Sequence, residues 1–326
     1  MGALVDMGIT HARYPATWDD FIGQGQAKRQ LQVAIESAKQ RGVPLNHVLL
    51  ASGEPGIGKT ALALLTALSM ETQIKMVSGK MKENEARIAL AGMEDGDVLF
   101  MDEAHRLVQG GKGNAEWILH LLADGVLMGP RGPEEQAAIT VIAATTDAGK
   151  LPDTITSRFP LQPVLKPYTD DEAAIIGVRR AGALFDRPLP FPDADTLRAV
   201  ARAGNNNPRT IGAILENLRD LAHVDLETVC PDATENGGQQ AYVLDEALQW
   251  MGLTPDGLTE VACRYLVTLV DEFAGQAGEK AMQDRLQEAG IQSVERTLMA
   301  KGLIAKTRQG RVATRDGILR AKELMT

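Results

Sequence analysis

The sequence predicts an α/β fold built on a parallel sheet, followed by two smaller, mainly helical domains. Two short apolar runs, 48–50 and 98–101, are each followed by polar residues that could bind a ligand or take part in catalysis. This is the pattern at the carboxyl ends of buried parallel strands. Beyond residue 167 the pattern becomes wholly helical. A chain of 326 residues also exceeds the size of a single core, which stops growing at about 250 residues. We therefore expect three domains, at 1–167, 168–252 and 253–326.

A phosphate-loop pattern, G-x-x-x-x-G-K-[ST], follows the first apolar run. In such loops backbone N–H groups hold phosphate oxygens, the lysine reaches the β- and γ-phosphates, and the hydroxyl ligates Mg²⁺. The leucine- and alanine-rich run after the loop predicts a helix, whose N-terminal dipole favours anions. The competing interpretation is a simple glycine turn between a strand and a helix. The predicted nucleotide-binding residues are Gly53, Glu54, Pro55, Gly56, Ile57, Gly58, Lys59, Thr60 and Ala61.

An aromatic and glycine-bearing segment, 18–24, precedes the loop and leads into a helical pattern that ends near residue 41. Its position suits a purine-binding role, with Phe21 and Ile22 as the candidate contacts. The same residues could equally form a helix cap with buried aromatic side chains. The sequence leaves both interpretations open.

The second apolar run ends in Asp102 and Glu103. In phosphate-loop enzymes such an aspartate holds Mg²⁺, and a following glutamate can orient or deprotonate water. A strand that ends in a solvated acidic turn is the alternative, and it leaves the pairing with Lys59 unexplained. A third strand, 140–145, ends at Thr146, where a hydroxyl could reach the γ-phosphate or its attacking water.

Periodicity predicts the remaining elements of the first two domains. They are a strand at 74–77, helices at 82–90 and 114–123, a loop tip or short hairpin at 129–133, a short strand at 161–165, and helices at 169–185, 193–203 and 208–222. Residues 1–13 show no useful periodicity, and 231–238 predict a polar linker.

The last segment, from about residue 254, predicts three helices and then a β-hairpin at 303–314, which is the winged-helix arrangement. From Val294 onward eight basic residues face three acidic ones, a net charge of +5, so the remainder of a chain of net charge −9 carries −14. This asymmetry indicates one end that faces a polyanion. The predicted contacts are to the DNA backbone, independent of base sequence, and a solvated turn is the alternative. The residues are Lys306, Arg308, Arg311 and Arg315.

Composition excludes several classes of protein. No apolar run approaches the length of about 20 residues that spans a bilayer, and the N-terminus lacks the charged-then-apolar pattern of a signal peptide. Two isolated cysteines offer no zinc site or disulfide framework. We expect a cytoplasmic protein without a membrane partner.

Taken in order, the motifs resemble the RuvB family, the Holliday-junction branch-migration ATPases of the AAA+ class. The resemblance covers about residues 13–319, and the Asp-Glu-x-His-Arg-Leu run together with the basic wing is its most specific part. Its segments are 21–24, 47–60, 78–79, 96–107, 144–146, 157–159, 207–209 and 306–314.

The resemblance implies ATP as the nucleotide, Mg²⁺ as the metal, and a role in DNA recombination and repair as a helicase-type motor. Lys59 and Thr60 would bind phosphates and Mg²⁺, Asp102 would hold the metal, and Glu103 would activate water. Thr146 would match sensor 1 and Arg209 the sensor-2 arginine of the helical lid. Arg158 would be the finger presented to a neighbouring subunit, which implies a ring, by analogy a hexamer.

Four departures from the family pattern stand out. Ser52 is one residue extra before the phosphate loop, and Glu54 replaces a usual proline. Residues 205–207 read Asn-Asn-Asn where the family has Gly-Thr before Pro-Arg. Residues 124–139 are expected to lack the apolar hairpin that docks the junction-binding partner RuvA, which places dependence on that partner in doubt.

Three rival functions remain open from the sequence. Residues 102–105 also spell the motif of DEAH-box helicases, but those have a second α/β motor domain where this chain is helical. A clamp- or helicase-loader keeps the AAA+ fold and remodels a replication protein on DNA. A non-catalytic scaffold would not need Lys59, Asp102 and Glu103.

Overall fold

A computed structural model of the chain describes residues 14–109, 115–185, 192–223, 239–288 and 290–325. The chain divides into two compact units. The first comprises Met1–Asp186 and Asn206–Gly212, and the second comprises Arg187–Asn205 and Ala213–Thr326. The domain boundaries at 167 and 252 stay predictions. The segments 1–13 and 231–238, expected to be loosely ordered and a linker, lie outside the described residues.

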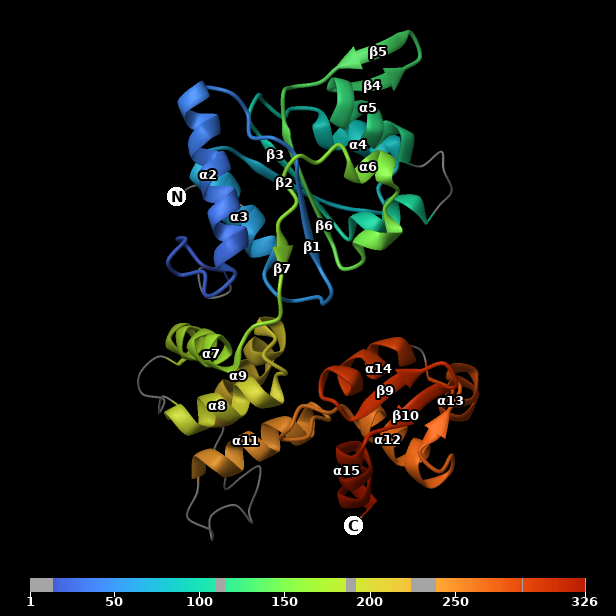
Figure 1. Cartoon of the computed structure of the whole chain (residues 1–326). Coiled ribbons are helices and arrows are strands. Elements are labelled where there is room, and N and C mark those ends of the chain that lie inside the picture. Colours follow the sequence, from blue (N-terminus) through green and yellow to red (C-terminus); the bar gives the residue numbers. More distant parts are fainter. Residues whose placement is uncertain (1–13, 110–114, 186–191, 224–238, 289, 326) are drawn as a thin grey trace. The chain divides into compact units, whose positions relative to one another are not determined.

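A five-stranded parallel sheet forms the centre of the first unit (Figure 1). Its strands lie in the order β2-β3-β6-β1-β7, so β1 has β6 and β7 as neighbours and β3 has β2 and β6. All five predicted strands are confirmed, at β1 (Val48–Ser52), β2 (Ile74–Ser78), β3 (Val98–Asp102), β6 (Thr140–Thr145) and β7 (Val164–Leu165). Parallel pairing brings the carboxyl ends of β1, β3 and β6 to one edge.

Both faces of the sheet are buried, which explains the continuous apolar runs. Alternate residues of β3 point to opposite faces: Leu99 and Met101 join one core and Val98 and Phe100 the other. Figure 1 shows α2 (Gly25–Arg41) and α3 (Lys59–Met70) on one side of the sheet, with α4 (Glu83–Leu90), α5 (Glu116–Asp124) and α6 (Asp153–Thr156) on the other. Trp117 of α5 is 2% exposed and belongs to the core.

An antiparallel hairpin connects α5 to β6. Its strands are β4 (Val126–Gly129) and β5 (Gly132–Glu135), so the predicted turn at 129–133 is confirmed. The hairpin is short: a two-residue turn at Pro130 and Arg131 joins strands of four residues, and β5 ends in two glutamates. The expectation that 124–139 lack the family's apolar hairpin stays a prediction. Leu127 is buried, whereas Met128 and Glu134 are exposed.

Helices follow the sheet, as the change of pattern at residue 167 predicts. α7 (Asp170–Leu184) begins with a capping box in which Thr169 and Glu172 satisfy each other's backbone N–H groups. α8 (Ala194–Ala203), capped by Asp193, α9 (Pro208–His223) and α11 (Gln239–Trp250) come next. No helix in the described ranges is long and apolar enough to cross a membrane.

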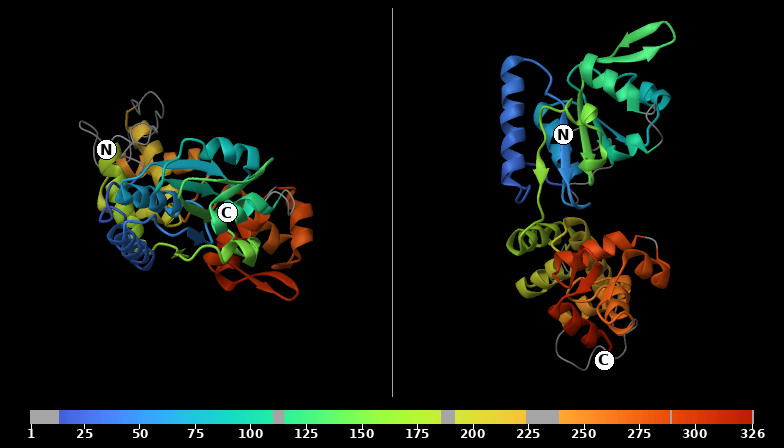
Figure 2. Two further views of the ribbon diagram at one scale, coloured as in Figure 1. Left: turned by 90° about the horizontal axis from the view of Figure 1, so that it is seen from above. Right: turned by 45° about the vertical axis from the view of Figure 1, so that its right-hand side comes forward.

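The C-terminal part of the second unit has the predicted winged-helix arrangement. Three helices, α12 (Glu260–Asp271), α13 (Glu279–Leu286) and α14 (Ile291–Ala300), precede a hairpin of β9 (Ile304–Thr307) and β10 (Gly310–Ala313). Two elements were not predicted: β8 (Gln276–Ala277), which pairs with β10 and makes it the central strand, and the final helix α15 (Arg315–Met325). Figure 2 shows the β9–β10 hairpin, in the red C-terminal part of the chain, in two further views.

Candidate nucleotide site and basic wing

The phosphate loop connects β1 to α3 at the carboxyl edge of the sheet. Gly58 caps α3 with a left-handed φ of 108°, a conformation that favours glycine. A Cβ at this position would also lie 2.8 Å from Phe21 Cζ. Lys59 and Thr60 therefore open the helix directly after a turn that few other residues could make, and the helix N-terminus faces the site.

Lys59 is 6% exposed and is held by two oxygen atoms. Its Nζ donates to Ser52 Oγ over 2.6 Å and to the Glu54 carbonyl over 3.2 Å, and Ser52 itself donates to the same carbonyl over 2.6 Å. Burial lowers the pKa of Lys59, and the carboxylates of Asp102 and Glu103 oppose that effect. The extra residue Ser52 thus orients the lysine, a role that the sequence did not indicate.

The acidic pair lies at the carboxyl end of β3, as predicted. Asp102 Oδ1 accepts the Glu103 backbone N–H over 2.9 Å, and Glu103 adopts a left-handed φ of 54°, uncommon for a residue with a side chain. Gly79, at the end of β2, donates its N–H to the Asp102 carbonyl over 2.7 Å. A Cβ at Gly79 would lie 2.2 Å from the Glu103 carbonyl oxygen, so this glycine permits the close approach of the two strand ends.

The strand β6 brings its own hydroxyl groups to the same edge. Thr146, the sensor-1 candidate, directly follows β6 and is half-buried. Thr145 is fully buried, and its Oγ1 lies 3.0 Å from His105 Nδ1. His105 was named only as part of a motif, so the sequence did not reveal this contact.

The start of α9 lies directly over the phosphate loop. Asn207 donates from Nδ2 to the Pro55 carbonyl over 2.7 Å and accepts the Arg209 N–H at Oδ1 over 3.0 Å. A Cβ at Gly56 would lie 2.9 Å from Arg209 Cβ. The charge of Arg209 also contributes to the lowered pKa of Lys59. The Asn-Asn-Asn departure therefore leaves the sensor-2 candidate beside the loop.

The segment before α2 supports the phosphate loop. Phe21 is 4% exposed and packs in the core that includes Ile57, while Ile22 is half-buried. Tyr168 OH donates to the Ile57 carbonyl over 3.1 Å, and burial raises the pKa of this phenol to about 12. The buried-aromatic alternative thus describes the Phe21 ring, and a purine-binding role of the segment stays a prediction.

Arg158 follows α6 and lies on the surface. It forms no ion pair with any carboxylate in the described ranges. An exposed, unpaired guanidinium is available to a neighbouring molecule, which is what a finger in trans requires. Whether it meets a second subunit's nucleotide stays a prediction.

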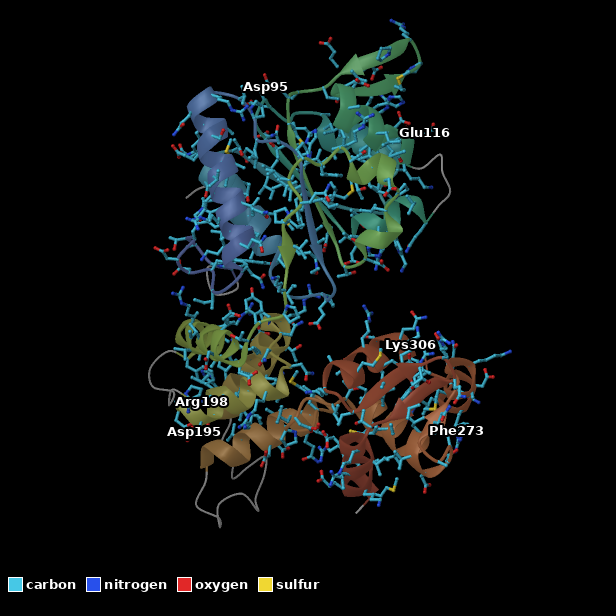
Figure 3. All side chains as sticks on the ribbon, viewed as in Figure 1. Asp95, Glu116, Asp195, Arg198, Phe273 and Lys306 are labelled. Carbon is cyan, nitrogen blue, oxygen red and sulfur yellow. The ribbon has the colours of Figure 1, made fainter. Side chains whose placement is uncertain are left out.

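The basic wing differs from its prediction at one residue. Lys306, labelled in Figure 3, is exposed, as are Arg308 and Arg315. Arg311 is only 7% exposed. It lies on the central strand, where its Nη2 donates to Glu279 Oε2 over 2.6 Å and to Glu295 Oε2 over 2.7 Å. These carboxylates raise the pKa of Arg311, and both accept from its Nη2.

The assignment of Arg311 as a phosphate contact is therefore corrected. Glu295 is 2% exposed and would be an unpaired buried charge without the arginine. Tyr265 donates to the other oxygen of Glu295 over 2.9 Å. Arg311 thus belongs to a buried polar network that joins β10 to α12, α13 and α14.

The site fits a nucleotide and Mg²⁺. Asp102 Oδ2 and the Thr60 hydroxyl have no hydrogen-bonding partner within the described ranges, and a buried ammonium group lies within electrostatic range of both carboxylates. A parallel sheet in this strand order, with its phosphate loop facing an acidic pair, belongs to the AAA+ class of phosphate-loop ATPases.

Comparisons with known proteins define the family. The family model "Holliday junction DNA helicase RuvB P-loop domain" matches residues 13–165, and "RuvB C-terminal winged helix domain" matches residues 255–321. A Kosmotoga olearia protein, "Holliday junction branch migration complex subunit RuvB", is 32% identical over 94% of this chain and 89% of its own length. A Rubrobacter xylanophilus protein of the same name is 33% identical over 92% and 84%.

A solved structure of the Thermotoga maritima RuvB Holliday junction branch migration motor is similar as well. It has a TM-score of 0.77 and 30% identity, with 96% of this chain and 99% of that chain covered. This chain belongs to the RuvB family, and it is an ATPase. The comparisons favour a branch-migration motor over a clamp or helicase loader.

Proposed function

We propose that the chain hydrolyses ATP to drive branch migration of four-way junction DNA. The observation that carries the proposal is the convergence of Lys59, Asp102, Glu103 and Thr146 at one sheet edge, in a chain that also has an exposed basic wing. Sequence similarity to proteins named branch migration subunits extends over both parts. A scaffold would need neither part.

Each residue of the ATPase centre has a proposed task. The amides of 53–61 and the Lys59 ammonium would bind the phosphates, and Thr60 and Asp102 would hold Mg²⁺. When bound, the metal neutralises charge on the phosphate oxygens. Glu103 would orient and deprotonate the attacking water, Thr146 would contact the γ-phosphate, and Arg209 would bring the lid onto it. Phe21 and Ile22 would line the purine site.

The active centre is proposed to be completed between subunits. Arg158 is exposed and unpaired within the described residues, and it would neutralise charge on the nucleotide of an adjacent copy. Such sharing requires adjacent copies of the chain, and we propose that they form a ring of six subunits. DNA would be held through backbone contacts by Lys306, Arg308 and Arg315, without base readout.

The β4–β5 hairpin supports a proposal about a junction-binding partner. Arg87 of α4 pairs with Glu83 over 2.9 Å and also bonds to Glu134 and to the Met128 carbonyl, so it fastens the β4–β5 hairpin to the body. The hairpin presents Met128, 47% exposed, beside charged residues. We propose this tip as the docking surface of a RuvA-like partner, and the cytoplasm, where chromosomal DNA lies in bacteria, as the site of action.

Steady-state ATP hydrolysis with no DNA, linear duplex and a four-way junction tests the proposal. We expect duplex and junction DNA to stimulate ATP turnover. We also expect a labelled junction to dissociate into duplex arms, without cleavage, when ATP is present. An ATP hydrolysis rate that no DNA changes, together with tight binding to a replicative helicase or sliding clamp, would instead identify a loader.

A further inference from the structure

His105 occupies a position that the ATPase motif does not explain. It lies in the short helix η1 (Ala104–Val108), directly after the acidic pair, and its side chain is 9% exposed. One ring nitrogen faces the strand β6 and the other faces Glu103. The buried imidazole therefore lies between the end of β6 and Glu103, and it could transmit a movement of one to the other.

The hydrogen bonds around Thr145 determine which tautomer fits. The Asp147 backbone N–H donates to Thr145 Oγ1 over 3.0 Å, and the same oxygen lies 3.0 Å from His105 Nδ1. Since one donor already points at this oxygen, the Thr145 hydroxyl hydrogen can point at Nδ1. A neutral imidazole then has its proton on Nε2.

That proton faces the carboxylate of Glu103. Nε2 lies 3.4 Å from Glu103 Oε2. The opposite tautomer would aim a nitrogen lone pair at a negative charge, which is repulsive. Hydrogen bonds therefore link the Asp147 amide to Thr145 and the Thr145 hydroxyl to His105, and each polarises the next. The His105 Nε2–H then faces Glu103 Oε2 over 3.4 Å as an electrostatic contact.

The backbone of Glu103 is already fixed, whereas its side chain needs a guide. Its φ of 54° and the contact with Gly79 define where the chain runs. Arg106 Nε also lies 3.7 Å from Glu103 Oε2, but that arginine side chain is 39% exposed and solvent screens its charge. Of these two side chains, the buried His105 has the closer contact.

We propose that His105 is a positioning residue that couples the end of β6 to Glu103. Thr145 is covalently adjacent to Thr146, the proposed γ-phosphate sensor, so a shift of Thr146 on contact with phosphate would move the imidazole and with it the carboxylate. The proposal rests on Glu103 being the base. No proton is transferred through His105, which only orients the Glu103 carboxylate.

Two amide substitutions separate the two contacts of the ring. In His105→Gln the terminal NH₂ stands near the place of Nε2 and keeps a donor facing Glu103. In His105→Asn the amide stands near the place of Nδ1, keeps Thr145 and cannot reach Glu103. We expect His105→Asn to lower kcat about a hundredfold, since a displacement of about 1 Å at a reacting group costs that much. His105→Gln should recover most of the activity.

Binding and folding provide the controls. The Kd for ATP and the thermal unfolding midpoint should be the same in both variants, because neither contacts the phosphate loop. Equal kcat in the Asn and Gln variants, or decreases that follow the unfolding midpoint, would overturn the proposal. If His105→Asn folds poorly, Thr145→Val and Thr145→Ser repeat the test: Val lacks the hydroxyl and should lower kcat, and Ser retains it.

A double variant separates this inference from the proposed function. In a Glu103→Gln background, His105→Asn should cause no further decrease in kcat, because its effect passes through the carboxylate. Near-normal turnover of Glu103→Gln alone would refute Glu103 as the base. A slow Glu103→Gln together with a normal His105→Asn would refute only the coupling.

Discussion

The phosphate loop and the basic wing were both predicted from short motifs, but the structure agrees with the two predictions to different degrees. Around the loop, the predicted start of a helix is present, because a left-handed glycine directly before a helix dictates the backbone there. On the wing, three of four predicted cations are exposed and one is buried in an ion pair. A pattern that specifies backbone geometry predicts more than a pattern that counts charges.

The largest expected effect tests whether the ATPase centre is complete within one chain. Arg158→Ala should lower kcat about a thousandfold, within the range of about 10³–10⁵ typical of arginine fingers. Mixing these chains with Glu103→Gln chains should restore some activity, because mixed rings contain interfaces with both an intact base and an intact finger. No recovery at any mixing ratio, with mixed rings confirmed by native mass spectrometry, would count against action in trans.

Glu103→Gln is expected to slow hydrolysis at least about a hundredfold, because a positioned base contributes about 10²–10⁴-fold. Its affinity for ATP should remain, whereas Lys59→Ala should weaken ATP binding itself. Single-turnover hydrolysis and equilibrium binding of a fluorescent ATP analogue distinguish the two. Turnover near that of the unaltered protein would place the base elsewhere.

Arg311→Ala addresses the wing directly. Removing one partner of a buried ion pair costs about 3–5 kcal/mol, so the β9 and β10 amides should exchange with solvent about a hundredfold faster or more. Arg308→Ala, which removes an exposed cation from the same hairpin, should leave exchange nearly unchanged. A lower salt slope of DNA binding with normal exchange would show instead that Arg311 touches phosphate.

The smallest expected effect concerns the exposed wing cations. A Lys306→Ala, Arg308→Ala double variant should retain its DNA-free ATPase activity and bind duplex more weakly. Its log–log salt slope should shrink by about 0.9 for each phosphate that the protein no longer neutralises. Lys280→Ala, Lys322→Ala removes the same charge from exposed positions outside the hairpin and serves as the matched control. Identical slopes in the two double variants would refute the wing as the DNA-binding surface.

The positions of the strands and of most helices followed from the sequence. Runs such as 98–101 are apolar on both faces, a pattern typical of a covered parallel strand. The phosphate loop needs glycine where φ is positive, and Asp102 and Glu103 end a strand. These are local requirements, so residues within a few positions of one another suffice to reveal them.

Other features depended on partners far along the chain. Arg311 is buried because Glu295 and Glu279, 16 and 32 residues before it, meet it on one face of β10, and β8 makes that strand central. His105 reaches Thr145 across 40 residues, and Asn207 reaches the Pro55 carbonyl across 152. Whether a cation faces solvent or a carboxylate depends on which strands pair, and only the tertiary structure decides that.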